Sequence, residues 1–118
     1  MYTAKCLALN ELVAIKCLDL DASYADMERI RREAKTLLLL SHPNVLSAHC
    51  AFLVNQYLWE VMPFMSGGSF QTILRTFSPD GLQESIIATV LKKTLKALDY
   101  LHEEGHIHRD VKAGNILF

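Results

Sequence analysis

The sequence of 118 residues has no basic run, no long apolar segment and few cysteines. Twelve basic residues against thirteen acidic ones give a formal net charge of −1, which argues against a nucleic-acid partner or an anionic membrane surface. The longest obvious apolar block, residues 37–40, is far too short to span a bilayer. The first residues lack a basic stretch followed by an apolar one, so we expect no secretory signal and a cytoplasmic location.

The sequence also gives little support for a disulfide framework or a metal site. The three cysteines are odd in number and form no Cys-x-x-Cys pair: Cys6, Cys17 and Cys50. We expect reduced thiols rather than a disulfide framework or a zinc site. A zinc alternative at His102, His106 and His108 is disfavoured, because no cysteine lies near them and the spacing is poor for a tetrahedral site.

The amino-acid composition is that of a globular protein. Hydrophobic residues make up 51% and charged residues 21%, so the chain is neither disordered nor highly charged. At this length we expect one domain with a core of ordinary size.

The first half predicts strands and one helix. Apolar and β-branched runs predict strands over residues 2–8, 12–20, 45–53 and 57–62, with turns at Asn10–Glu11 and Asn55–Gln56. Ser23 and Asp26 form a capping-box-like helix start. Apolar residues at spacings of three and four follow, and the helix ends before Pro43.

The second half predicts a linker followed by helices. Residues 62–69 carry a proline and two glycines, and Ser69 is placed to cap a short helix over residues 70–77. After a turn at Ser78–Gly81, a longer helix has one apolar face and ends at Gly105 in the left-handed cap position.

The most specific stretch runs from His108 to Asn115. Asp110, Lys112 and Asn115 lie close enough for one loop to aim a base, a cation and a metal-binding oxygen at the same point. This combination suits phosphoryl transfer, which depends on positioning and charge neutralisation more than on covalent catalysis. The stretch resembles the catalytic loop of protein kinases.

Other segments extend this resemblance over essentially the whole chain. Val13-Ala14-Ile15-Lys16 resembles the third strand of a eukaryotic protein kinase, and residues 58–62 resemble the strand that enters its hinge. The sequences of residues 62–69 and 111–115 resemble those of Sterile-twenty-like serine/threonine kinases. They are most similar to the Fray and oxidative-stress-responsive branch in its plant-type form.

The resemblance implies an incomplete protein-kinase-like α+β fold. Residues 1–62 would form the small lobe, with a mostly antiparallel sheet that lacks its first strand and with the C-helix. Residues 63–69 would form the hinge. Residues 70–118 would begin the large lobe with its first helices and catalytic loop.

The resemblance also implies a nucleotide site. Lys16 would hold the α- and β-phosphates of ATP while paired with Glu33. Met62 would be the gatekeeper residue. The Pro63 carbonyl would accept a hydrogen bond from adenine, and the Met65 amide would donate one to it. Ala14 and Leu117 would sandwich the adenine ring.

In the catalytic loop, Asp110 would accept the proton of a Ser or Thr hydroxyl on a protein substrate, a contribution of about 10²–10⁴ in rate. Lys112 would neutralise the transferring phosphoryl group, Asn115 would bind one Mg²⁺, and His108 would brace the loop through backbone hydrogen bonds.

Two expected motifs are not in the sequence. A glycine-rich loop should precede Met1 and an Asp-Phe-Gly motif should follow Asn115. Asn115 alone is a neutral, single-oxygen ligand, so we expect an incomplete Mg²⁺ site and an inactive chain. Three hypotheses stay open: a kinase fragment that works in a longer product, a non-catalytic module that binds a kinase partner through exposed apolar surface, or a degenerate gene product.

Glu60 is a separate anomaly. With a strand period of two it shares an inward face with Leu58 and Met62, where the resemblance implies an apolar residue. A carboxylate there needs a partner, a raised pKa or disturbed packing. A misjudged strand register and relaxed selection on a degenerate copy are the alternatives.

Overall fold

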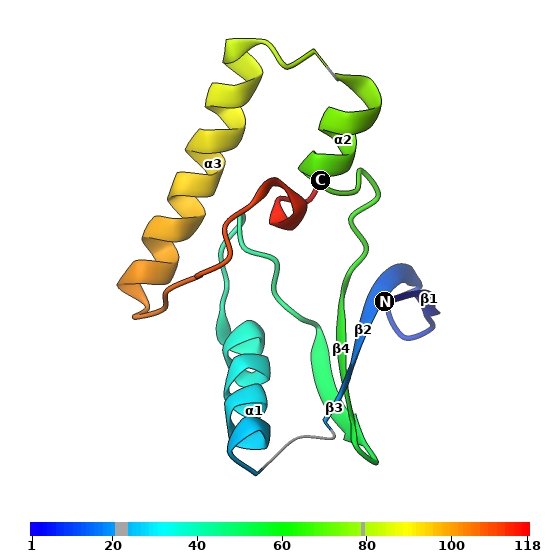
Figure 1. Ribbon diagram of the computed structural model, residues 1–118. Helices are drawn as coiled ribbons and strands as arrows, with labels where there is room; N and C mark the ends of the chain where they lie inside the picture. The colour runs from blue at the N-terminus through cyan, green and yellow to red at the C-terminus, as the bar shows by residue number, and fades with distance from the viewer. Residues whose placement is uncertain (21–23, 79) are drawn as a thin grey trace. The chain divides into compact units, whose positions relative to one another are not determined.

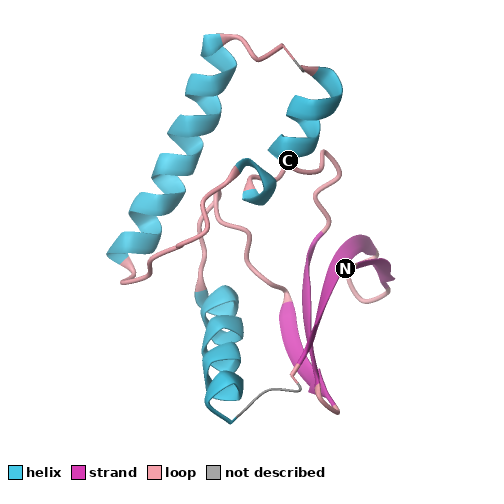
Figure 2. Ribbon diagram, in the orientation of Figure 1, coloured by secondary structure: helices cyan, strands magenta, loops and turns pink. Residues whose placement is uncertain are grey.

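The computed structural model describes residues 1–20, 24–78 and 80–118 (Figures 1 and 2). It contains four strands and several helices, which confirms the predicted partial kinase-like α+β fold. The elements are β1 (Tyr2–Cys6), β2 (Glu11–Asp19), α1 (Tyr24–Leu39), β3 (Cys50–Val54), β4 (Tyr57–Pro63), α2 (Phe70–Phe77), α3 (Glu84–Glu103) and the 3₁₀ turn η1 (Ala113–Asn115).

The described residues divide into two compact units. The first comprises Met1–Ser41 and Val45–Phe64, and the second comprises His42–Asn44 and Met65–Phe118. The sheet and α1 belong to the first unit. The helices α2 and α3 and the loop that contains Asp110 belong to the second.

The sheet of the first unit has the strand order β1-β2-β4-β3, and all neighbouring strands are antiparallel. Figure 1 labels the four strands. The turns between β1 and β2 and between β3 and β4 contain Asn10 and Asn55, each with a φ of 54°. Asparagine tolerates this left-handed conformation better than most residues. The two predicted turns are therefore confirmed.

Two predicted strands have the wrong bounds. Residues 2–8 were expected to be extended, but β1 ends at Cys6. Residues 45–53 were expected to be extended, but β3 runs from Cys50 to Val54. Its ladder with β4 ends at Cys50 opposite Val61, after which the His49 amide donates to the Val61 carbonyl at 2.7 Å. Continued pairing would set Ala48 opposite Pro63, which has no amide hydrogen to give to a ladder.

The core of the first unit lies between α1 and one face of the sheet. Leu20, Ala34 and Leu58 are buried there, and partly buried apolar residues pack around them: Leu18, Ile30 and Ala51. Figure 1 shows α1 beside the sheet, and α1 contacts β3. The helix start at Ser23 lies outside the described residues, as do the side chains of several residues in α1, including Asp26.

Glu60 lies on the same face as Leu58 and is only 3% exposed. The predicted inward position of Glu60 is therefore confirmed. This buried carboxylate is the unusual feature of an otherwise apolar core.

The opposite face of the sheet carries an aromatic row. Trp59 lies between Tyr2 and Phe52, with ring centroids 6.3 Å and 6.4 Å apart respectively. Tyr2 and Phe52 are exposed, so this row is an apolar surface that the sequence pattern did not reveal.

In the second unit, both predicted helix signals are confirmed. The Thr72 amide donates to the Ser69 hydroxyl at 3.2 Å, so Ser69 caps α2 as expected. Gly105 has a φ of +79° just after α3, as the predicted left-handed cap requires. On α3, Val90 and Leu101 are buried, whereas several apolar residues of the expected stripe are exposed: Ile86, Ile87, Leu91 and Leu95.

Among the described residues, no helix combines the length and the apolar character needed to cross a membrane.

We predict that Leu58→Ala destabilises the chain by about 2–5 kcal/mol, because it removes a buried side chain from the small core beneath α1. Urea unfolding followed by circular dichroism measures this loss. Leu7→Ala is the matched control, since Leu7 is 88% exposed and its truncation leaves no cavity. Equal effects of the two substitutions would contradict this location of the core.

Candidate catalytic loop and nucleotide-binding residues

The loop after α3 is anchored at both ends by backbone hydrogen bonds. At its start, the His106 amide donates to the Leu101 carbonyl at 2.8 Å. At its end, the Phe70 amide donates to the Ile116 carbonyl at 2.8 Å, and the Phe118 amide donates to the Gly68 carbonyl at 3.0 Å. The linker before α2 therefore pairs with residues 116–118, and residues 106–115 lie between two fixed points.

Gly67 permits the close approach of these two segments. Its amide donates to the Phe118 carbonyl at 2.7 Å. A Cβ atom added at Gly67 would lie 2.8 Å from the Phe118 Cβ and 2.9 Å from its carbonyl oxygen, closer than real Cβ atoms come. A side chain at position 67 would therefore clash with Phe118, and glycine is required there for steric reasons.

The loop brings three of the predicted site residues together. The Lys112 Nζ lies 2.8 Å from the Asp110 Oδ2. The Asn115 Nδ2 donates to the same carboxylate oxygen at 3.0 Å and to the Asp110 carbonyl at 2.8 Å. Since η1 begins at Ala113, the chain turns just after Lys112 and returns the Asn115 amide to Asp110.

These contacts set the charge of Asp110. Hydrogen bonding to the Lys112 ammonium, and next to Asn115, lowers the pKa of the Asp110 carboxyl below its ordinary value of 3.8. The side chain is exposed, so it is an ionised and accessible carboxylate at neutral pH. The His108 Nδ1 accepts a hydrogen bond from the Asp110 amide at 3.2 Å, which is a contact of the kind expected for His108.

Sequence reasoning missed the backbone conformation of Arg109. Its φ is 64°, in the left-handed region that side chains other than glycine, asparagine and aspartate rarely adopt. Nothing in the residue type signals this strain. It lies directly before Asp110, so the backbone turn that presents the carboxylate is held by the surrounding hydrogen bonds.

The same cluster offers little to a magnesium ion. The two side-chain hydrogen bonds of Asn115 use its Nδ2 atom, which leaves the Oδ1 atom available as one ligand. The neighbouring Asp110 oxygen is already paired with an ammonium. Within residues 1–20, 24–78 and 80–118, no group of three or more His, Cys, Asp or Glu side chains is gathered as a metal site would need. The residues present therefore fit a single Mg²⁺ ligand, Asn115.

In the first unit, Lys16 has an acidic neighbour that the sequence did not assign to it. Lys16 on β2 is directly opposite Glu60 on β4, and the Lys16 Nζ lies 3.6 Å from the Glu60 Oε2. The predicted pairing of Lys16 with Glu33 stays a prediction, because the Glu33 side chain lies outside the described residues. The sequence pattern turns Glu60 inward, but only the pairing of β2 with β4 sets it opposite Lys16.

The residues predicted to contact adenine are divided between the two units. Ala14 is opposite Met62 in the β2–β4 ladder, and Pro63 is the last residue of β4. The Met65 carbonyl accepts a hydrogen bond from the Gly68 amide at 3.1 Å, and Leu117 forms a bridge with Ser69. Ala14 belongs to the first unit and Leu117 to the second, so the expected adenine sandwich stays a prediction.

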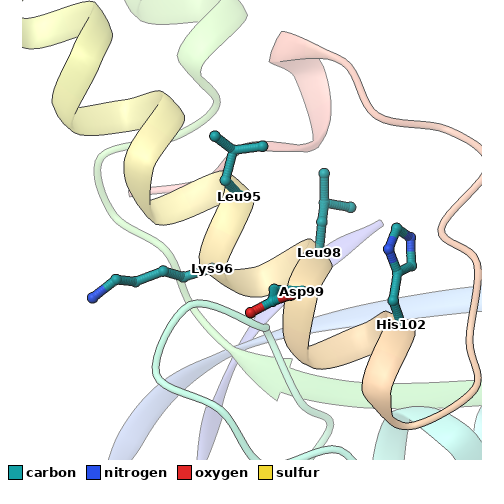
Figure 3. A pocket seen from close by; sticks show the side chains of 5 residues that line it. All are labelled: Leu95, Lys96, Leu98, Asp99 and His102. Carbon is teal, nitrogen blue, oxygen red and sulfur yellow. The ribbon is translucent and has the colours of Figure 1, made fainter.

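A surface hollow on α3 contains none of these residues. It has a volume of about 410 Å³ and is lined by Leu95, Lys96, Leu98, Asp99 and His102. Figure 3 shows Leu95, Leu98 and His102 projecting from successive turns of the helix, whereas Lys96 points away from them. All five lining residues come from α3 alone, so the hollow is a poor candidate for an enclosed small-molecule site.

Comparison with known proteins gives matches over the whole length of the chain. Residues 1–118 match the family model described as protein kinase domain. The serine/threonine-protein kinase fray2 of Dictyostelium discoideum is 47% identical over 115 residues. Germinal center kinase 3 of Caenorhabditis elegans is 41% identical over 126 residues. The human STE20-related kinase adapter protein beta is 35% identical over 120 residues.

These alignments cover nearly all of this chain but little of each relative. They include 97% of the chain and 11% of fray2, 99% and 21% of germinal center kinase 3, and 99% and 28% of the human adapter. The predicted likeness to Sterile-twenty-like kinases and their Fray branch is confirmed. The plant-type form stays a prediction.

We predict that Lys112→Met raises the pKa of the Asp110 carboxyl toward 3.8, because it removes the largest cause of the lowered pKa. A pH titration followed by carboxyl-carbon NMR measures the midpoint. In the unaltered chain the midpoint of the Asp110 titration should lie below 3.8.

Lys93→Met is the control for this titration, since Lys93 is an exposed lysine of α3 that does not contribute to the shift. An Asp110 midpoint that is the same in the unaltered chain and in Lys112→Met would contradict the observed ion pair.

Proposed function

The chain belongs to the protein kinase domain family, and we propose that it carries the catalytic loop and phosphate-binding lysine of a serine/threonine kinase. The reaction would transfer the γ-phosphate of ATP to a Ser or Thr hydroxyl of a protein substrate. The observation that carries this proposal is the contact of Lys112 and Asn115 with one oxygen of Asp110, at 2.8 Å and 3.0 Å.

Each of these residues has a distinct task in the proposed reaction. The ionised Asp110 carboxylate accepts the proton as the substrate oxygen forms its bond to the γ-phosphorus and the bond to ADP breaks. The Lys112 ammonium moves from Asp110 to the charge on the transferring phosphoryl group. Mg²⁺, when bound, neutralises phosphate charge, and Asn115 supplies one oxygen toward it.

We further propose that these 118 residues do not transfer phosphate by themselves. The support is the number of ligands at Asn115, since one neutral oxygen beside a carboxylate already paired with lysine is a weak site for a divalent ion. The activity would then belong to a longer product that adds an acidic ligand to the neutral oxygen of Asn115.

A non-catalytic role is the second candidate. The STE20-related kinase adapter proteins are similar to this chain, and by name they act as adapters of kinases. The buried carboxylate beside Lys16 also disfavours a phosphate at that lysine. In this alternative the chain would bind a kinase partner through exposed apolar surface, such as the exposed residues of α3.

In the longest product that contains residues 1–118, we predict that Asp110→Asn lowers γ-phosphate transfer by about 10²–10⁴, because the base is lost while the shape is kept. Transfer of radiolabelled phosphate from ATP to a generic basic protein is the measurement. Asp99→Asn, an exposed change on α3, is the control and should leave the rate unchanged. A rate insensitive to Asp110→Asn would exclude this base.

For the 118-residue chain alone, we predict no transfer above background in the same assay. Transfer that disappears on Asp110→Asn would refute the proposed dependence on a longer product. The adapter alternative predicts instead that Asp110→Asn leaves stimulation of a partner kinase intact.

A further inference from the structure

Glu60 occupies a buried position where a carboxylate destabilises the fold unless it is paired. It lies in β4 between β2 and β3, opposite both Lys16 and Ala51, and is 3% exposed. Among the residues that the structure describes, none makes a hydrogen bond to its buried Oε2 atom. A buried charge in this state is stable only beside an opposite charge.

Lys16 is that opposite charge. Its Nζ lies 3.6 Å from the Glu60 Oε2, which is close enough for strong attraction but beyond a normal hydrogen bond. The cross-strand register fixes this pairing, because Lys16 and Glu60 face each other in the β2–β4 ladder. Lys16 is less buried than its partner, with 44% of its side chain exposed, so solvent anions can reach its ammonium group.

The same ammonium is the group proposed to hold the phosphates of ATP. A phosphate at Lys16 would have to share the lysine with Glu60 and would bring a second negative charge beside a buried carboxylate. Both effects oppose binding: the ion pair loses part of its attraction, and like charges repel at low solvent exposure.

We propose that Glu60 competes with nucleotide phosphate for Lys16 and thereby lowers the affinity of the chain for nucleoside triphosphates. This inference rests on the proposed nucleotide role of Lys16. Glu60 acts as a positioning residue: it holds the lysine within its own sheet, and nucleotide binding must overcome that hold. A single residue of β4, Glu60, then lowers the affinity of the chain for ATP.

The pairing itself is tested without nucleotide. We expect Lys16→Met to raise the unfolding equilibrium constant at least about tenfold more in the unaltered chain than in a Glu60→Leu chain, because only the former leaves a buried carboxylate unpaired. Urea unfolding of the 118-residue chain, the two single variants and the double variant gives this difference. Equal effects of Lys16→Met in the two backgrounds would overturn the proposal.

The competition is tested by calorimetric titration with ATP and Mg²⁺, and separately with adenosine, which has no phosphate. Glu60→Gln keeps the size of the side chain and removes its charge, and Glu60→Leu makes the position apolar. We expect both variants to bind ATP at least about tenfold more tightly than the unaltered chain, with adenosine binding unchanged. Glu84→Gln, an exposed change on α3, is the control and should alter neither affinity.

The outcomes separate the two proposals. If the unaltered chain binds ATP and both Glu60 variants bind it no more tightly, the competition is wrong and the nucleotide role stands. Equal tightening toward adenosine also overturns the competition, since the effect would then come from packing. If no variant binds ATP, the proposed nucleotide role fails and the competition fails with it.

Discussion

The pairing of β2 with β4 is the constraint on which most of the first unit depends. Seven residue pairs in this ladder set Ala14 against Met62 and Lys16 against Glu60, and they put Leu58 on the face that α1 covers. A shift by one residue would turn all of these side chains to the other face of the sheet. The core, the lysine and the strand that leads into the linker are therefore fixed by one register.

The loop of the second unit depends on a different kind of support. Its three polar side chains are exposed and contribute little buried surface, so the core does not hold them. Backbone hydrogen bonds to the linker and to the end of α3 hold the loop instead, and they stabilise the left-handed conformation of Arg109. Local backbone strain of this kind is concentrated at functional sites in proteins generally.

Much of this arrangement was predictable from local signals. Ser69 and Gly105 mark helix ends through side-chain chemistry and backbone freedom, and both predictions are confirmed. The start of β3 was not predictable, because it depends on which residue of another strand comes to face Pro63. The partner of Lys16 was missed for the same reason: the alternation of β4 turned Glu60 inward, but only the pairing between strands shows which cation it meets.

The aromatic row has a consequence for observing this protein. Trp59 is the sole tryptophan of the sequence, and it lies between Tyr2 and Phe52 on the sheet face opposite α1. Its neighbour in the chain, Glu60, projects from the other face of the same strand. Indole emission is therefore an intrinsic optical signal from the centre of the sheet, and it comes from the residue next to Glu60 without any added label.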